Sequence, residues 1–70
     1  MKIYGYAENS DILLELEEVT IQASIDEINK IIEFFTHTKM LMEDNPDTFG
    51  HEHLLDFCEL KTNSDIILIR

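Results

Sequence analysis

The sequence predicts a small α+β domain of order β-β-α-β-β, in which a mainly antiparallel four-stranded sheet carries one amphipathic helix on one face. Two observations predict this fold class. One helical pattern covers residues 24–43, and two strand-like apolar patterns lie on each side of it. No repeat or low-complexity segment interrupts this order. Because a helix and a sheet bury their apolar faces against each other, residues 1–70 are expected to form a single layered domain.

The helix has clear start and stop signals. Ser24 can cap the first turn, and Glu27 can return the hydrogen bond in a capping box. Asn45-Pro46 ends the pattern, because proline cannot continue a helix. The expected core-facing stripe consists of Ile28, Ile31, Ile32, Phe35 and Met42, with Ile25 at its margin.

Two apolar residues of the helix lie outside this stripe. Phe34 and Leu41 are seven residues apart and form a second, smaller ridge on another side of the helix. Side chains of strands or loops would cover the ridge in one interpretation. In the other, the ridge contacts a partner or a second copy of the chain.

Residues 2–23 predict a β-hairpin. Residues 2–7 alternate as a strand does, and the polar residues 8–11 predict a turn into an antiparallel neighbour. Residues 12–23 form the longest strand candidate, because their centre is β-branched. The apolar alternation changes register near Glu17 and Glu18, which predicts a β-bulge there.

Residues 43–70 predict a loop and two further strands. Residues 43–50 contain the only proline and should form a surface loop. Residues 51–60 allow either a short helix or a strand, and we favour the strand. After a turn at 61–64, the apolar run in residues 65–70 is typical of a central strand that is covered on both faces or pairs between neighbours.

The composition is strongly acidic. Fifteen acidic residues against five basic ones give a formal charge of −10, and the acids are spread along the chain. Such a charge strongly disfavours binding to nucleic acid. It would attract a basic protein partner, or it would simply keep the surface hydrated.

The chain contains one cysteine and no long apolar run. Cys58 excludes an intramolecular disulfide framework, and no basic-then-apolar leader precedes the domain. These features predict a cytoplasmic protein without a membrane span. A chain of 70 residues builds only a small core, so burial of a second apolar face in a homodimer would add stability.

The sharpest local pattern is His51-Glu52-His53. In a strand, His51 and His53 point to the same face and could bind one divalent metal. Candidates for a third ligand are Glu17, Glu18 and Asp56. The four-residue spacing of a helical zinc motif is not present, so a structural role or a direct partner contact are the other interpretations. A small metal-binding regulatory or accessory domain is therefore the alternative function.

Catalytic patterns are poorly represented. Cys58 with His53, or carboxylates from residues 15–18, are the only candidates for a nucleophile or an acid-base pair. Neither belongs to a catalytic motif, and Cys58 lies in an apolar stretch where a buried thiol is common. We predict a non-enzymatic protein that uses no cofactor.

Five segments resemble the immunity protein 32 family of bacterial polymorphic toxin systems. These are the opening KIYGY, then LELEEVTIQAS leading into a helix that begins SIDEI, the GHEH stretch after an acidic loop, and a final DIILI strand. In this order they span nearly the whole chain, from residue 2 to residue 69. The resemblance implies a small α+β protein that binds and neutralises a toxin domain inside the producing cell or its kin.

The resemblance also marks, by position, residues for a partner interface. They are Glu17, Glu18, His51, Glu52 and His53. If the toxin domain is basic, carboxylates of this chain would occupy its phosphate-binding cleft. Candidates for apolar anchors, independent of the resemblance, are Phe34, Leu41, Tyr4 and Tyr6, whose alternative is an ordinary place in the core.

Overall fold

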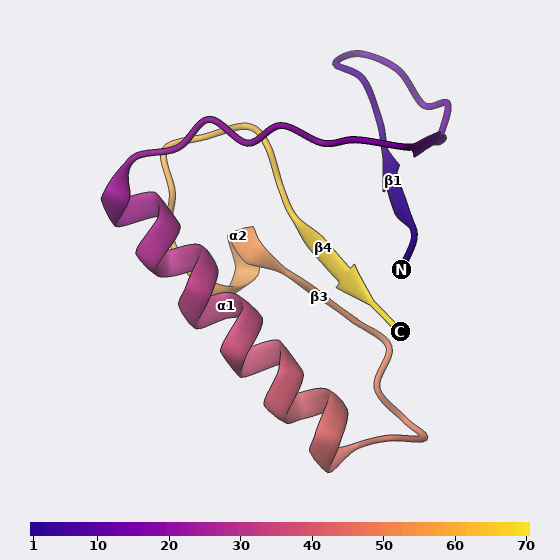
Figure 1. The fold of residues 1–70 in the computed structure, drawn as a ribbon, viewed down its shortest axis with the longest axis vertical. Helices are drawn as coiled ribbons and strands as arrows, with labels where there is room; N and C mark the ends of the chain where they lie inside the picture. The colour runs from indigo at the N-terminus through magenta and orange to yellow at the C-terminus, as the bar shows by residue number, and fades with distance from the viewer.

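The protein contains two helices and four short strands. A computed structural model describes all residues 1–70, and Figure 1 shows their arrangement. In chain order the elements are β1 (Ile3–Gly5), β2 (Leu14–Leu16), α1 (Ile25–Asp44), β3 (His51–His53), α2 (Leu54–Phe57) and β4 (Ile67–Ile69). The predicted α+β class is confirmed.

The predicted four-stranded sheet is wrong. The strands form two separate antiparallel pairs, β1 with β2 and β3 with β4, and no ladder joins one pair to the other. The physical reason is the length of the strands. Each has three residues, so every pair is short and each strand keeps one edge without a ladder.

The N-terminal hairpin is present where the sequence predicts it. Ile3 pairs with Leu16, and Gly5 pairs with Leu14. Asn9 has a φ of 57°, a left-handed conformation that asparagine tolerates better than most residues, and this lets the chain reverse after β1. Gly5 also has a steric role, because a Cβ there would lie 3.0 Å from Leu16 Cδ1.

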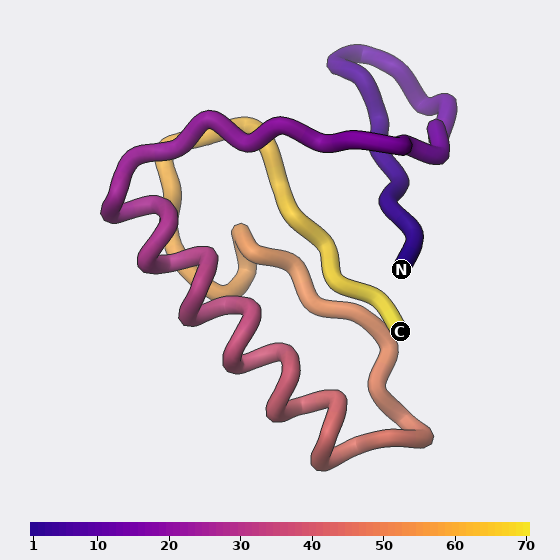
Figure 2. The backbone as a smooth tube through the Cα atoms, viewed as in Figure 1, coloured from indigo at the N-terminus to yellow at the C-terminus, as the bar shows by residue number.

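The second predicted strand is much shorter than expected. It ends at Leu16, the chain bends at Glu17, and the predicted bulge is therefore not part of a paired strand. Residues 17–23, which we call the connecting arm, then run from β2 to α1 (Figure 2). No residue of the arm belongs to a helix or a strand. The backbone of the arm therefore makes none of the hydrogen bonds of these elements, and it takes part in none of the other backbone–backbone hydrogen bonds of the chain.

The start and end of α1 agree with the sequence prediction. The Ser24 side chain accepts a hydrogen bond from Glu27 N at 3.2 Å, and Glu27 Oε1 accepts one from Ser24 N at 2.9 Å. These hydrogen bonds lower the pKa of Glu27, the one from the Ser24 backbone most strongly. At the other end, Asn45 N donates to Leu41 O at 3.0 Å and caps the last turn.

The packed side of α1 is not the predicted stripe. Phe34 and Thr38 are the only helix residues that are fully buried. The Phe34 ring lies 5.7 Å from the Phe57 ring of α2, so the smaller ridge of the helix faces the core. From the predicted stripe, Ile31 and Met42 are half-buried, whereas Ile25, Ile28, Ile32 and Phe35 are exposed. No sheet lies over these four residues, because the expected four-stranded sheet does not form.

The C-terminal half combines both alternatives for residues 51–60. β3 occupies residues 51–53, and the four-residue helix α2 follows at once, so the favoured all-strand interpretation is wrong after His53. His53 pairs with Ile67, and Leu54 N donates to Ile66 O at 2.8 Å beyond the end of the ladder. For β4, neither alternative for a central strand holds, because Ile67 and Ile69 are 50% and 60% exposed and the strand pairs with β3 alone. The irregular segment after α1 is confirmed.

Neither helix has the length and apolar character that a membrane span requires.

Candidate partner-binding surface

Asp65 makes three hydrogen bonds, to β3, to α2 and to the residue just before β4. Its Oδ2 lies 2.7 Å from His53 Nδ1, and its Oδ1 accepts from Leu55 N at 3.0 Å and from Ile66 N at 2.9 Å. His53 stands at the N-cap of α2 but makes no capping hydrogen bond with its own side chain. The Asp65 carboxylate therefore supplies the cap from a position before β4.

The charge state of Asp65 follows from these contacts. Burial raises the pKa of its carboxyl, but the hydrogen bonds from His53, Leu55 N and Ile66 N outweigh this effect, so the pKa is lowered from its ordinary value. Asp65 is therefore ionised at neutral pH and accepts a hydrogen bond from Nδ1–H of His53. This fixes the imidazole and leaves its Nε2 for another contact.

His51 and His53 lie on the same side of β3, as the sequence predicts. Their ring centroids are 5.2 Å apart in an edge-to-face arrangement. No group of three or more His, Cys, Asp or Glu side chains gathers in a geometry that could hold a metal ion. Neither Glu17, Glu18 nor Asp56 therefore joins the two histidines as the third ligand that the metal hypothesis needs.

The carboxylates of the chain are mostly unpaired. Only three of the 15 acidic residues form ion pairs, Glu15 with Lys2, Glu43 with Lys39, and Asp65 with His53. Glu17 and Glu18 are exposed at the start of the connecting arm, and Glu52 is partly buried in β3. No hydrogen bond or ion pair joins Glu17 or Glu18 to the histidines of β3.

The predicted apolar anchors differ in their exposure to solvent. Phe34 has no exposed surface and belongs to the core, so it cannot contact a partner in the folded chain. Leu41, two turns further along α1, is half-buried. Tyr4 and Tyr6 are 44% and 63% exposed and remain available for contact.

A large hollow opens between α1, the connecting arm, β1 and β4. It measures about 1,670 Å³, and most of its 28 lining residues are hydrophobic. Six of the lining residues form what we call the open apolar face: Val19, Ile21, Ile31, Phe35, Ile67 and Ile69. Pockets for small ligands measure roughly 300–1,000 Å³, so a protein segment suits this hollow better than a small molecule does.

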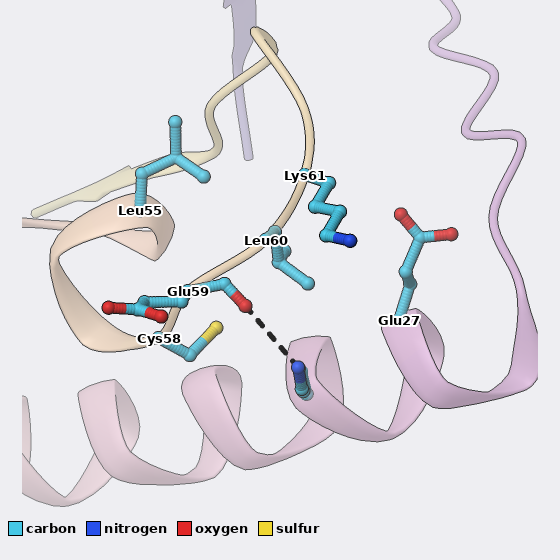
Figure 3. A pocket seen from close by; sticks show the side chains of 7 residues that line it. Glu27, Leu55, Cys58, Glu59, Leu60 and Lys61 are labelled. Atoms are coloured by element: carbon cyan, nitrogen blue, oxygen red, sulfur yellow. Dashed lines mark hydrogen bonds between the residues drawn. The ribbon is translucent and has the colours of Figure 1, made fainter.

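A smaller groove of about 650 Å³ lies between α1 and the segment after α2 (Figure 3). Lys30 lines the groove, and its Nζ donates to the Glu59 carbonyl at 3.3 Å, the dashed line in Figure 3. The thiol of Cys58 lines the groove and donates to Leu54 O at 3.7 Å, with no hydrogen bond to His53. Acidic, basic and apolar groups are mixed around the groove, and they form no catalytic pair.

Asp65 is the site residue that the sequence did not reveal. Its partners Leu55 and His53 lie 10 and 12 residues earlier in the chain. Local patterns such as capping boxes join residues three apart, so they cannot find this contact. The one available signal is that the α2 N-cap is a histidine, a residue type that caps helices poorly.

Comparison of the chain with protein-family models, with curated proteins and with solved structures finds no match. The resemblance to the immunity protein 32 family therefore stays a prediction.

Proposed function

We propose that this protein is a non-enzymatic immunity protein, which binds a basic toxin domain in the cytoplasm and neutralises it at a stoichiometry of one to one. The observation that carries the proposal is the unbalanced surface charge. The net charge is −10, and most of the carboxylates have no cationic partner within the chain. Such a surface attracts a basic partner and raises the rate of encounter.

β3 supplies a second, more specific part of the proposed interface. Asp65 holds the His53 ring in one orientation, and the exposed His51 ring stands next to it. A side chain that is already fixed loses less conformational entropy on binding than a mobile one. The acids at Glu17 and Glu18 then steer the toxin, while His51 and His53 add directed hydrogen bonds.

The proposal is tested with a tagged form of the chain, captured from a lysate of its source cell at low and at moderate salt. The captured protein is identified, purified and assayed for toxic activity. We expect the chain to abolish this activity at one equivalent, and we expect added salt to weaken the complex because it screens opposite charges. Charge reversal at Glu17→Lys and Glu18→Lys should weaken binding by at least tenfold, as for paired rim charges.

The matched control reverses two exposed acids elsewhere, Glu33→Lys and Asp47→Lys, which changes the net charge by the same amount. An equal loss of affinity in both double variants would mean that only the overall field matters. Capture of a partner whose activity the chain leaves unchanged would contradict the proposed function.

A further inference from the structure

We propose that the open apolar face is covered by a second copy of this chain, and that the two connecting arms pair as antiparallel strands across the twofold axis. This inference does not depend on the proposed toxin, because it concerns the chain alone. It rests on the arm, on the total exposed surface, and on the self-complementary sequence of the arm.

The connecting arm has the sequence of a strand but has no strand partner. Val19, Thr20 and Ile21 are β-branched, which favours extended backbone. The arm runs from the hairpin to the start of α1 in Figure 2, and no backbone–backbone hydrogen bond involves its residues. Its N–H and C=O groups are therefore available to a neighbouring strand.

The exposed surface of the chain is larger than that of a typical monomer of its mass. The accessible surface is 6205 Å² for 8.2 kDa. A monomer of this mass exposes about 4,500 Å², so the excess is about 1,700 Å². Two copies that cover this excess bury about 3,400 Å² together, within the range of about 2,000–5,000 Å² for obligate homodimers.

The chemistry of the face identifies the occupant as the same face of another copy. Val19 and Ile21 of the arm are about half exposed, as are Phe35 of α1 and Ile67 and Ile69 of β4. In a twofold dimer each patch meets its own counterpart, so an apolar patch meets an apolar patch. A basic partner would instead seek the carboxylates outside this face.

A twofold axis at Thr20 gives the arm a favourable register. Val19 of one copy then lies opposite Ile21 of the other, a β-branched cross-strand pair. Glu18 lies opposite Gln22, so no two carboxylates face each other directly. The side chains of Val19 and Ile21 share one face of the paired arms, as residues two apart in a strand do.

The first test is sedimentation equilibrium of the purified 70-residue chain across a wide concentration range. We expect a mass of about twice the 8.2 kDa of one chain. Dimerisation should become tighter with added salt, because two chains of charge −10 repel each other. Binding of a basic toxin has the opposite salt dependence, so failure of one proposal is distinguished from failure of the other.

The decisive variant is Ile21→Lys, which places a charge at the centre of the paired arms. We expect it to weaken dimerisation by about 100-fold or more, because each dimer would bury two lysine side chains, one from each copy. The matched control is Ile12→Lys in the hairpin loop outside the hollow, where Ile12 is 65% exposed and Ile21 is 55% exposed. It should leave the dimer intact, and circular dichroism reports whether both variants keep α1 folded.

A cross-link tests the register even where Ile21→Lys fails to fold. In a Cys58→Ala background, Thr20→Cys places two thiols opposite each other at a Cα separation of about 4.5–5.5 Å, within the range for a disulfide. Mild oxidation should yield a covalent dimer, whereas Thr48→Cys in the loop after α1 should not. A monomeric mass at all concentrations, or a dimer that neither Ile21→Lys weakens nor Thr20→Cys cross-links, would overturn the proposal.

Discussion

Asp65 is the residue with the most demanding set of contacts in the C-terminal half. Its carboxylate accepts hydrogen bonds from a side chain in β3, from an amide in α2 and from the amide of Ile66 just before β4. Removal of the carboxylate leaves two backbone amides without their acceptor. Loss of a helix cap of this kind costs about 0.5–2 kcal/mol.

The first prediction is that Asp65→Ala lowers the free energy of unfolding by about 1–2 kcal/mol at pH 7. Because the pKa of Asp65 is lower in the folded chain, its ionised form stabilises the fold above the ordinary pKa of 3.8 that the group has in the unfolded chain. This stabilisation is lost as the pH falls through the folded pKa. In urea titrations, the stabilities of wild type and variant should therefore begin to converge as the pH falls below about 4, and the convergence should be complete only below the lowered pKa of the folded chain.

Asp65→Asn provides the matched control for that titration. Its amide oxygen keeps an acceptor for the Leu55 amide but carries no charge, so its loss at pH 7 should be smaller than that of Asp65→Ala. A stability difference between wild type and Asp65→Ala that stays constant down to pH 2 would contradict the assigned role of the ionised carboxylate.

Thr38 leads to the second prediction. Its hydroxyl is fully buried on α1, and its Oγ1 has no hydrogen-bond partner. A buried unpaired hydroxyl costs about 1–3 kcal/mol, so Thr38→Val, which keeps the shape, should raise the free energy of unfolding by about 1 kcal/mol. The control Thr36→Val changes an exposed residue and should stay within about 0.5 kcal/mol of wild type. Destabilisation by Thr38→Val in urea titrations would indicate a partner for the hydroxyl.

At the residue scale, the sequence predicted contacts over short distances and missed those over long ones. Ser24 and Glu27 are three residues apart, and both hydrogen bonds of their capping box formed as predicted. The contact between His53 and Asp65 spans 12 residues and depends on the pairing of β3 with β4. No local pattern contains that information.

At the scale of elements, the amphipathic pattern of α1 predicted where the helix begins and ends, but not which of its sides packs against the core. The length of the helix and both of its ends were predicted, because caps and proline act locally. The side that packs was not. The smaller ridge packs because α2 places the Phe57 ring against Phe34, and the periodicity of α1 does not contain the position of α2.

The third prediction compares two neighbouring phenylalanines of α1. Phe34→Ala removes a fully buried ring and should cost about 3–5 kcal/mol. The free energy of unfolding of a native domain is about 0.05–0.15 kcal/mol per residue, so this loss removes much or all of the stability of the chain. Phe35 is 45% exposed, and Phe35→Ala should leave the isolated chain folded while it weakens the proposed dimer. Thermal unfolding followed by circular dichroism distinguishes the two; similar midpoints for both variants would contradict the assigned core.

Residues 51–60 illustrate a second limit at this scale. Periodicity allowed a strand or a short helix, and the chain uses one after the other. The change occurs at Leu54, where the amide still bonds to Ile66 O while the side chain enters the core at 3% exposure. A segment that changes type after three residues is shorter than the windows in which periodicity can be read.

At the scale of the whole molecule, the sequence correctly predicted the α+β class, but it predicted neither α2 nor how the strands assemble. Four strand-like patterns suggested one sheet, whereas the structure contains two pairs. Strand patterns record which residues favour extended backbone, and they do not record the identity of the neighbour. If the connecting arms pair across a twofold axis, part of the strand propensity of residues 12–23 is satisfied between chains.

The connecting arm also has a consequence for how the chain opens. The hairpin of β1 and β2 shares no ladder with the C-terminal pair, and the arm joins it to α1 without backbone hydrogen bonds of its own. Segments joined in this way open as separate cooperative units, each with its own local free energy. In a single chain, amide protons of the hairpin should therefore exchange with solvent well before those in the middle of α1. Assembly of two chains would slow this exchange, so the hairpin would acquire its kinetic protection from the neighbouring molecule.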